Sequence, residues 1–372
     1  MATLRQVERF TVTIGAAATS NTYTLSTTLL DTSKAFVVWG HEVSGNSPQN
    51  ALITGNITNT TTLTFTRFAS DGNAVVIVGY VAEFIDGVYV QRGSATTSGT
   101  GADITLSSIT LAKSFRIFSY TRSGGSAFGA DDFIRSYLWD DAGTIKLNWS
   151  TISGWGGLLE WQVIEYDDCA VQRGLVDLDA PPPPAQGGSI TDTITPVDRS
   201  KSFLLADWNN NGADRPDEFN LRCQINTTSQ ITFDRDDTAG DLQISWEVVE
   251  FTDDTTVEEK LVSFADTDGE EDVTITTLTS LNCSIALAGG NTGYGGKSNY
   301  TGDDTPGTGW FTLDLTSTSN LKIKRALTNE TADVAAYIIE FSGGPGVLIN
   351  GTTPGKVNSR PWANIGLING VG

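Results

Sequence analysis

The chain has 372 residues, and 39% of them are hydrophobic, so it can bury cores and is not a disordered tail. Its 23 lysine and arginine residues against 44 aspartate and glutamate residues give a net charge of -21. This balance argues against binding to a nucleic-acid backbone or to an anionic membrane surface. One histidine and three cysteines exclude most zinc sites and most histidine-based catalysis.

Targeting and membrane signals are not evident. The first thirty residues carry charge and alternate in polarity, so we expect no secretory signal. No run approaches 18 apolar residues, and we expect no membrane span. Cys169, Cys223 and Cys283 are odd in number and widely spaced, which favours buried free thiols in a chain that folds in a reducing cytoplasm.

Strands are predicted along nearly the whole chain. Apolar and polar residues alternate with period two at residues 63–67, then at 231–235, and again at 321–325. Clusters of Gly, Asn, Asp and Ser interrupt such stretches at short intervals, and no stretch of a dozen residues holds a clean helical period. The sequence therefore predicts an all-β chain.

Four segments of the sequence end alike. Each closes on two apolar residues, a glutamate and an aromatic residue, and the glutamates are Glu83, Glu165, Glu250 and Glu340. Upstream of them, alternating strands end on Arg67, Trp149, Arg235 and Arg325. The tetrapeptide Val-Gln-Arg-Gly follows the first two segments, at residues 90–93 and 171–174. Repetition at a fixed period is typical of tandem structural units.

We therefore predict four tandem antiparallel β-sandwich modules of about 80–90 residues each, followed by an arm. The modules are expected at residues 1–93, 94–174, 175–260 and 261–342. A proline-rich spacer at 180–188 lies near the start of the third module and stiffens that junction. Residues 343–372 are rich in Gly, Pro and Asn and lack the repeat, so we predict an extended arm.

The recurring arginines and glutamates admit two interpretations. Arg67, Arg235 and Arg325 could be clamps for a carboxylate or a sugar, or each could pair with the glutamate of its own module across adjacent strands. We favour the structural pairing, because it recurs in three of the four copies. Glu165, whose copy has Trp149 in place of arginine, would need another partner, such as a backbone amide.

No catalytic centre, cofactor or metal site is predicted. His41, the one imidazole, follows a strand, lies beside no nucleophile motif and is expected in a solvent-exposed turn. Glycoside hydrolysis needs two carboxyls about 5–10 Å apart in a cleft, a geometry that acidic doublets in a sequence do not define. Two acidic stretches with a turn glycine offer oxygen ligands for calcium but lack the helical loop pattern. Their candidate ligands are Asp234, Asp236, Asp241, Asp266 and Asp268.

Acidic, Thr-, Gly- and Asn-rich tandem β-units with motifs of the Val-Val-Glu-Phe and Val-Gln-Arg-Gly kind resemble structural proteins of tailed bacteriophages over residues 1–342. That resemblance implies a non-enzymatic virion part, either a head decoration protein, a head fibre or a tail component. Its partners would be capsid or tail subunits, and it would assemble in the host cytoplasm. The modules are also similar to the H-type lectin sandwich, which implies homo-oligomers, as trimers, and sugar binding.

Two alternatives to a purely structural role stay open. A carbohydrate or host-receptor binder would use aromatic side chains exposed in long loops, and Trp155, Tyr294 and Tyr300 are the candidates. A hydrolase of surface polysaccharide would need a carboxylate pair in a groove. Neither nucleic acid nor a membrane is expected as a partner in either case.

Overall fold

Seven antiparallel β-sheets are formed by the residues that the computed structural model describes, which are 1–125, 127–129, 132–178, 188–212, 214–290, 295–302 and 305–343. Strands account for 60% of the structure and helices for 7%, so the all-β prediction is confirmed. The proline-rich spacer, apart from Gly188, and the predicted arm beyond Gly343 lie outside the described residues.

The first group of strands forms two sheets, one inner and one outer. The inner sheet has the order β1-β6-β3 and the outer sheet the order β2-β5-β4. β6 is buried along most of its length, because both faces of the inner sheet are covered, whereas β5 alternates between buried and half-exposed residues. The strands are β1 (Thr3–Ile14), β2 (Ser20–Thr24), β3 (Ala35–Val43), β4 (Ile53–Asn59), β5 (Thr62–Arg67) and β6 (Val75–Asp86).

The same strand order recurs in the third and fourth groups. The third group has sheets β11-β16-β13 and β12-β15-β14, and the fourth has β17-β23-β19, with β20 beside β23, and β18-β22-β21. The third group comprises β11 (Cys169–Leu178), β12 (Ser189–Thr193), β13 (Ser202–Asn211), β14 (Arg222–Thr227), β15 (Gln230–Asp234) and β16 (Asp241–Phe251). The fourth comprises β17 (Thr256–Phe264), β18 (Glu270–Thr274), β19 (Ser284–Ala288), β20 (Lys297–Ser298), β21 (Thr312–Ser317), β22 (Asn320–Lys324) and β23 (Ala332–Glu340).

The second group differs because its two layers are parts of one continuous sheet. β7 (Val88–Thr105) and β10 (Thr144–Tyr166) are 18 and 23 residues long, and each spans the length of two strands elsewhere. They pair with β8 (Ser114–Tyr120) and β9 (Arg135–Asp141) in the order β7-β10-β8, with β9 also on β10. A register shift between Ser150 and Trp155 interrupts the pairing with β7.

Short helices connect the strands at both ends of the molecule. A 3-10 turn directly precedes β3, β8, β13 and β19, which we call the third strands of the four groups because they stand third in the sheet orders given above. These turns are η1 (Thr32–Lys34), η2 (Leu111–Lys113), η3 (Arg199–Lys201) and η4 (Leu281–Cys283). At the opposite end lie α1 (Pro48–Ala51), α2 (Pro216–Phe219) and η5 (Pro306–Thr308). β7, β11 and β17 run across the predicted module limits at 93, 174 and 260, and the number and limits of tandem modules stay a prediction.

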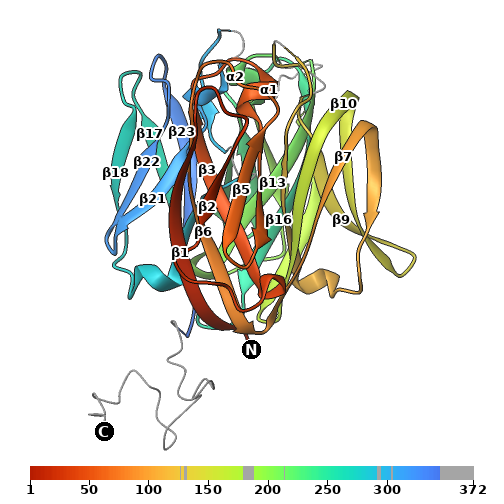
Figure 1. The fold of residues 1–372 in the computed structure, drawn as a ribbon, viewed down its shortest axis with the longest axis vertical. Helices are drawn as coiled ribbons and strands as arrows, with labels where there is room; N and C mark the ends of the chain where they lie inside the picture. Colours follow the sequence, from red (N-terminus) through yellow and green to blue (C-terminus); the bar gives the residue numbers. More distant parts are fainter. Residues whose placement is uncertain are drawn as a thin grey trace, which may run out of the picture.

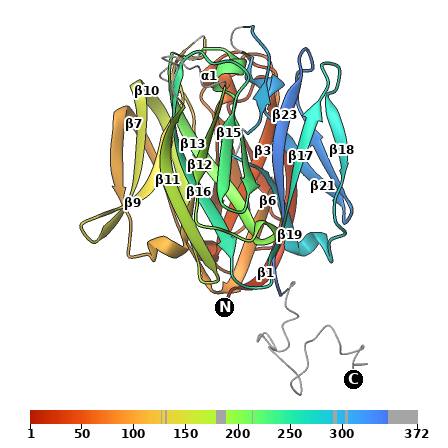
Figure 2. The same ribbon diagram turned by 180° about the vertical axis from the view of Figure 1, so that it is seen from behind.

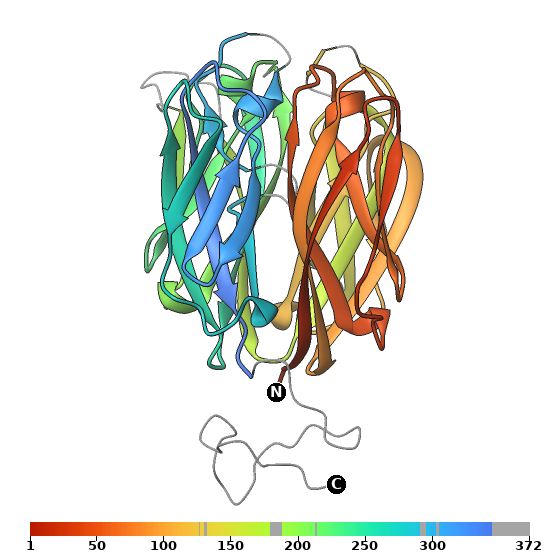
Figure 3. The same cartoon turned by 60° about the vertical axis from the view of Figure 1, so that its left-hand side comes forward.

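The four groups of strands surround a common axis. In Figure 1 the first group faces the viewer, with the fourth and second groups at its sides. Figure 2 shows the molecule from behind, where the third group faces the viewer. Figure 3 shows the strands of all groups running along the long axis of the molecule. The inner sheets therefore face one another across the centre. The outer layers lie on the outside, and their edge strands β4, β9, β14 and β21 pack against the neighbouring groups.

Four aromatic side chains close a ring of contacts on this axis. They are the residues that follow the recurring glutamates, namely Phe84, Tyr166, Phe251 and Phe341. Centroid distances are 5.5 Å from Phe84 to Tyr166, 5.2 Å from Tyr166 to Phe251, 6.1 Å from Phe251 to Phe341, and 5.3 Å from Phe341 back to Phe84. All four contacts are edge-to-face, the geometry that aromatic rings prefer. Because the contacts return to their start, the groups form a closed ring rather than an open row.

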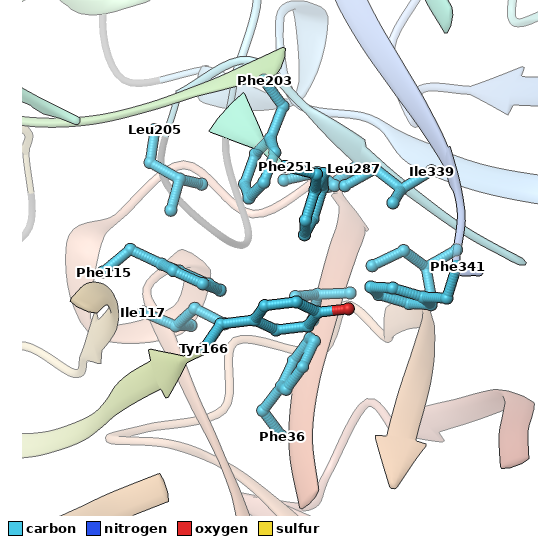
Figure 4. Close-up of a pocket in the computed structure, with 12 residues that line it drawn as sticks. Phe36, Phe115, Ile117, Tyr166, Phe203, Leu205, Phe251, Leu287, Ile339 and Phe341 are labelled. Carbon is cyan, nitrogen blue, oxygen red and sulfur yellow. The ribbon is translucent and has the colours of Figure 1, made fainter. Parts of the chain in front are cut away.

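Further apolar residues of the inner sheets surround these rings, as Figure 4 shows. Phe36, Phe115 and Phe203 occupy one matching position on β3, β8 and β13, and Ile285 occupies it on β19. The cavity between them measures about 10 Å³, which is no more than the space for one water molecule. The centre of the ring is therefore a packed core and not a ligand cavity.

Candidate functional site

The four recurring glutamates hold the turns that lead into the third strands. Each lies in register with the first residue of that strand, and its carboxylate accepts a hydrogen bond from a backbone amide just before the 3-10 turn. The amides belong to Leu30, Thr110, Asp198 and Thr279, and the N–O distances are 2.5, 2.9, 2.8 and 2.6 Å. We call this end of the molecule, defined by Glu83, Glu165, Glu250 and Glu340, the glutamate end. The backbone-amide partner expected for Glu165 is thus present, and all four glutamates use it.

The predicted pairing of arginine with glutamate is wrong. Arg67, Arg235 and Arg325 lie at the opposite end of the molecule, which we call the arginine end. The chain reverses direction between the outer strand that ends on the arginine and the inner strand that ends near the glutamate. The two residues therefore lie at opposite ends of the molecule. The buried guanidinium groups instead donate to loop carbonyls, as in the 3.0 Å bond from Arg67 to Ala18. Glu83 pairs with Arg5 of β1.

A third recurring position connects neighbouring groups, and it has no counterpart among the predicted residues. Three residues before each glutamate, a polar side chain hydrogen-bonds the backbone of the preceding group. Tyr80 accepts from Leu315, Gln162 from Val37, Glu247 from Arg116 and Tyr337 from Ile225, with N–O distances of 2.7, 3.0, 2.9 and 3.1 Å. Tyr80 belongs to the first group and Leu315 to the fourth, so this set of bonds also closes the ring. The sequence did contain a signal for this position, because a polar residue recurs at the same place in four otherwise apolar strands.

The Val-Gln-Arg-Gly motif contributes to the same junctions. Arg92 donates to the carbonyls of Thr32, the first residue of η1 in the first group, and of Ala35, which follows η1. Arg173 donates in the same way around η2, to Leu111 at 2.9 Å and to Ser114 at 2.6 Å. The motif thus recurs because each arginine binds the turn of the preceding group.

The junction between the second and third groups buries an ionic cluster. Arg116 of β8 has its Nε 3.3 Å from a carboxylate oxygen of Asp207 and its NH1 2.9 Å from Glu247. All three side chains are almost fully buried. Burial raises the pKa of Asp207 to about 6, and the charge of Arg116 opposes this shift. The cluster is part of the scaffold, because each of its charges has a partner across the junction.

An open groove lies between the first and second groups at the arginine end. Its volume is about 590 Å³, and its lining combines side chains of β5, β7 and β10 with the loop after β8. Hydroxyl groups dominate, contributed by Thr19, Thr66, Thr96, Ser98, Thr121 and Ser123. The ring of Phe68 is 49% exposed beside them. Hydroxyls together with an exposed aromatic face suit a carbohydrate, whose own hydroxyls and C–H faces they complement.

The chemistry of the groove favours binding rather than acid–base catalysis. Among its described lining residues Arg67 is the one charged side chain, so the lining offers no carboxylate pair. Glu160 lies nearby, two residues beyond Leu158 on the same face of β10, and accepts a 2.9 Å hydrogen bond from Asn56 of β4. Burial raises the pKa of Glu160 to about 7.

The predicted aromatic binding residues do not come together. Trp155 is wrong as an exposed loop residue: it lies in β10, is 2% exposed and packs 5.5 Å from the ring of Trp149. Tyr300 is half-buried and its carbonyl accepts the amide of Asp217 at 3.2 Å. Tyr294 lies outside the described residues. Phe68 was missed, although it directly follows a strand end and the loop-like residues 69–73 come after it, which was the signal that could have marked it as exposed.

The expectation for His41 is also wrong, whereas that for the cysteines holds. β3 continues to Val43 within a sheet covered on both faces, so His41 is 1% exposed. Its Nε2 lies 3.0 Å from the carbonyl oxygen of Ala51, and its ring lies 5.2 Å from that of Trp310. Cys169, Cys223 and Cys283 are buried free thiols, as predicted.

The acidic residues proposed for calcium are placed apart from one another. Asp234 is paired with Arg222 at 2.9 Å and with Lys297 at 3.1 Å, and Asp268 accepts the amide of Ala265 in its own turn. Asp236 and Asp266 are exposed, and Asp241 begins β16. Within the described residues, the group of three acidic side chains whose carboxylate oxygens lie within 4.8 Å of one another is Asp217, Glu218 and Asp237.

No protein-family model and no curated protein sequence matches this chain. Among the described residues there is no helix with the length and apolar character needed to cross a membrane.

Proposed function

We propose that the chain is a non-enzymatic structural protein of a bacteriophage virion, a head decoration protein, head fibre or tail component that docks on capsid or tail subunits. The observation that carries this proposal is the use of the recurring polar residues. They bind backbone groups within and between the groups of strands, as Glu340, Arg92 and Tyr80 do. Residues kept for a repeated ligand site would instead present unpaired groups to solvent.

A rigid ring of this kind suits a part that must hold its shape on a particle. The ring of Phe84, Tyr166, Phe251 and Phe341 fixes the inner sheets against one another, while the outward faces of the outer sheets are free to contact neighbouring subunits. The net charge of -21 favours partners with basic surfaces and keeps the free protein soluble before assembly.

Incorporation into particles tests the proposal. Full-length chain and a variant truncated after Gly343 are supplied during particle assembly, and particles are purified on a density gradient. We expect the full chain in the particle fraction at a fixed ratio to the major capsid or tail protein. We expect the truncated chain to melt at the same temperature yet to stay out of the particles. Absence of the full chain from purified particles would overturn the proposal.

The groove supports a second candidate function, binding of a carbohydrate or of a host receptor that carries one. A glycan array probed with the wild-type chain and with Phe68→Ala tests this candidate. Tyr89→Ala is the matched control, since Tyr89 is another aromatic residue with about half of its surface exposed, outside the groove. We expect a glycan signal that falls at least about tenfold in Phe68→Ala and persists in Tyr89→Ala. An array without signal for the wild-type chain would rule against this candidate.

A further inference from the structure

Three carboxylates converge at the arginine end of the third group. Asp217 and Glu218 belong to α2, and Asp237 lies in the loop that follows β15. One oxygen from each lies within 4.8 Å of the others. Asp217 and Glu218 are buried, so most of the negative charge is held away from solvent.

One buried oxygen of these carboxylates has no hydrogen-bond partner among the described residues. Asp217 is 2% exposed, and its buried Oδ1 accepts no hydrogen bond from any described residue. Burial raises the pKa of Asp217 to about 6, and Asp237 and Glu218 raise it further while Arg215 opposes them. Glu218 by contrast is fully used, because it accepts the amides of Asp214 and Arg215 and pairs with the Arg215 guanidinium. An unpartnered buried carboxylate oxygen is costly unless a ligand completes it.

The chain contains its own comparison for this place. A backbone hydrogen bond joins Asp237 to the carbonyl of Asp217 at 2.9 Å, and the same bond occurs in the first and fourth groups. There it joins Ala69 to Gln49 at 3.0 Å and Leu327 to Gly307 at 3.3 Å. The residues that follow Gln49 and Gly307, at the position of Glu218, are Asn50 and Thr308.

The same backbone arrangement therefore forms twice without any of the three carboxylates. The side chains at the three positions are Gln, Asn and Ala in the first group, and Gly, Thr and Leu in the fourth. The fold at this place therefore forms in two groups without negative charge at these positions. In the third group Glu218 and Asp237 accept backbone amides of their own turns, whereas the buried Oδ1 of Asp217 has no such use and needs another explanation.

We propose that Asp217, Glu218 and Asp237 bind a divalent cation of the calcium type. The donors are all oxygens, which excludes the nitrogen and sulfur ligands that zinc prefers. They come from a short helix and an irregular loop, a setting that suits the flexible coordination of calcium better than the strict octahedron of magnesium. Arg215, 39% exposed, is the resident partner of Glu218 and turns to solvent when the cation enters.

The test uses the full chain with calcium chloride as the probe, measured by isothermal titration calorimetry and by melting in calcium against chelator. We expect one calcium ion per chain and a melting temperature that rises with calcium. The variant D217Q/D237A carries the first-group residues at two ligand positions. It should still unfold cooperatively in chelator and should lose at least about tenfold in calcium affinity. D236N changes an exposed neighbour and should bind as the wild type does.

Several outcomes would overturn the proposal. These are the absence of both binding heat and a melting shift at millimolar calcium, an equal calcium shift in D217Q/D237A, and an equal affinity for magnesium. R215A supplies a separate check on Glu218, because removal of the competing guanidinium should tighten calcium binding. An unchanged affinity in R215A would contradict the assignment of Glu218 as a ligand.

Discussion

The glutamate end and the arginine end differ in how strictly they repeat. At the glutamate end all four groups use the same devices: the glutamate that accepts a turn amide, and the aromatic residue that joins the axial ring. At the arginine end the groups diverge. The first has α1 and one wall of the groove, the second has Trp149 in place of arginine, and the third has α2 with its three carboxylates.

This difference between the two ends distinguishes residues that hold the groups together from residues that could bind a ligand. A residue that joins one group to the next must be present at every junction, because a closed ring has no free end at which it could be omitted. A binding site needs to exist only once. The uniform end should therefore respond to substitution with a loss of stability, and the variable end with changed binding and little loss of stability.

The largest effect is expected at a junction. Arg116→Ala removes the buried cation of Asp207 and leaves Glu247 with the longer 3.4 Å contact to Arg173, which should lower the free energy of unfolding by about 3–5 kcal/mol. Chemical denaturation measures the loss. Arg199→Ala removes an arginine whose side chain is 44% exposed and pairs with Glu259. This substitution should lower the free energy of unfolding by at most about 1 kcal/mol. Equal losses in the two variants would break the distinction between buried junctions and the surface.

A second large effect is expected on the axis. Phe84→Ala removes a buried ring that contacts Tyr166 and Phe341, and should cost about 3–4 kcal/mol. Phe68→Ala at the arginine end should change stability by less than about 0.5 kcal/mol, because its ring is half-exposed in the groove. Thermal melting of the two variants compares the ends directly. A larger loss in Phe68→Ala would reverse the comparison.

The smallest effect is a pH dependence beside the groove. The pKa of Glu160 is raised from 4.5 to about 7, so the folded state favours its protonated form. The wild-type chain should therefore lose stability as the pH rises from about 4.5 through 7, where this carboxyl ionises in the folded protein. Glu160→Gln removes that loss and should melt a few degrees higher than the wild type at pH 8. At pH 4 the two should melt together, and an equal gain at both pH values would mean that ionisation of Glu160 is not the cause.

Much of the glutamate end was readable from the sequence. Alternation at residues 63–67 and a continuous apolar run before Glu83 reflect the difference between an outer strand and an inner one. The spacing of the glutamates predicted that they occupy equivalent positions, and their register in the strands agrees with this. The partner was misassigned, because linear spacing between Arg67 and Glu83 does not state that the chain reverses between them.

The arginine end was not readable in the same way. The groove joins residues from both sides of a junction between two groups, and nothing in the sequence states which loops meet there. Asp217 and Asp237 are brought together only because α2 lies against the loop after β15. Trp155 looked exposed among its glycines, although the strand continues through them and buries the ring.

The central claim is that the four groups of strands stabilise one another as one closed ring. Differential scanning calorimetry of the full chain tests it most directly. We predict a single unfolding transition whose calorimetric enthalpy equals its van't Hoff enthalpy. Two or more separate transitions would contradict the claim, because they would mean that the groups melt independently of their neighbours.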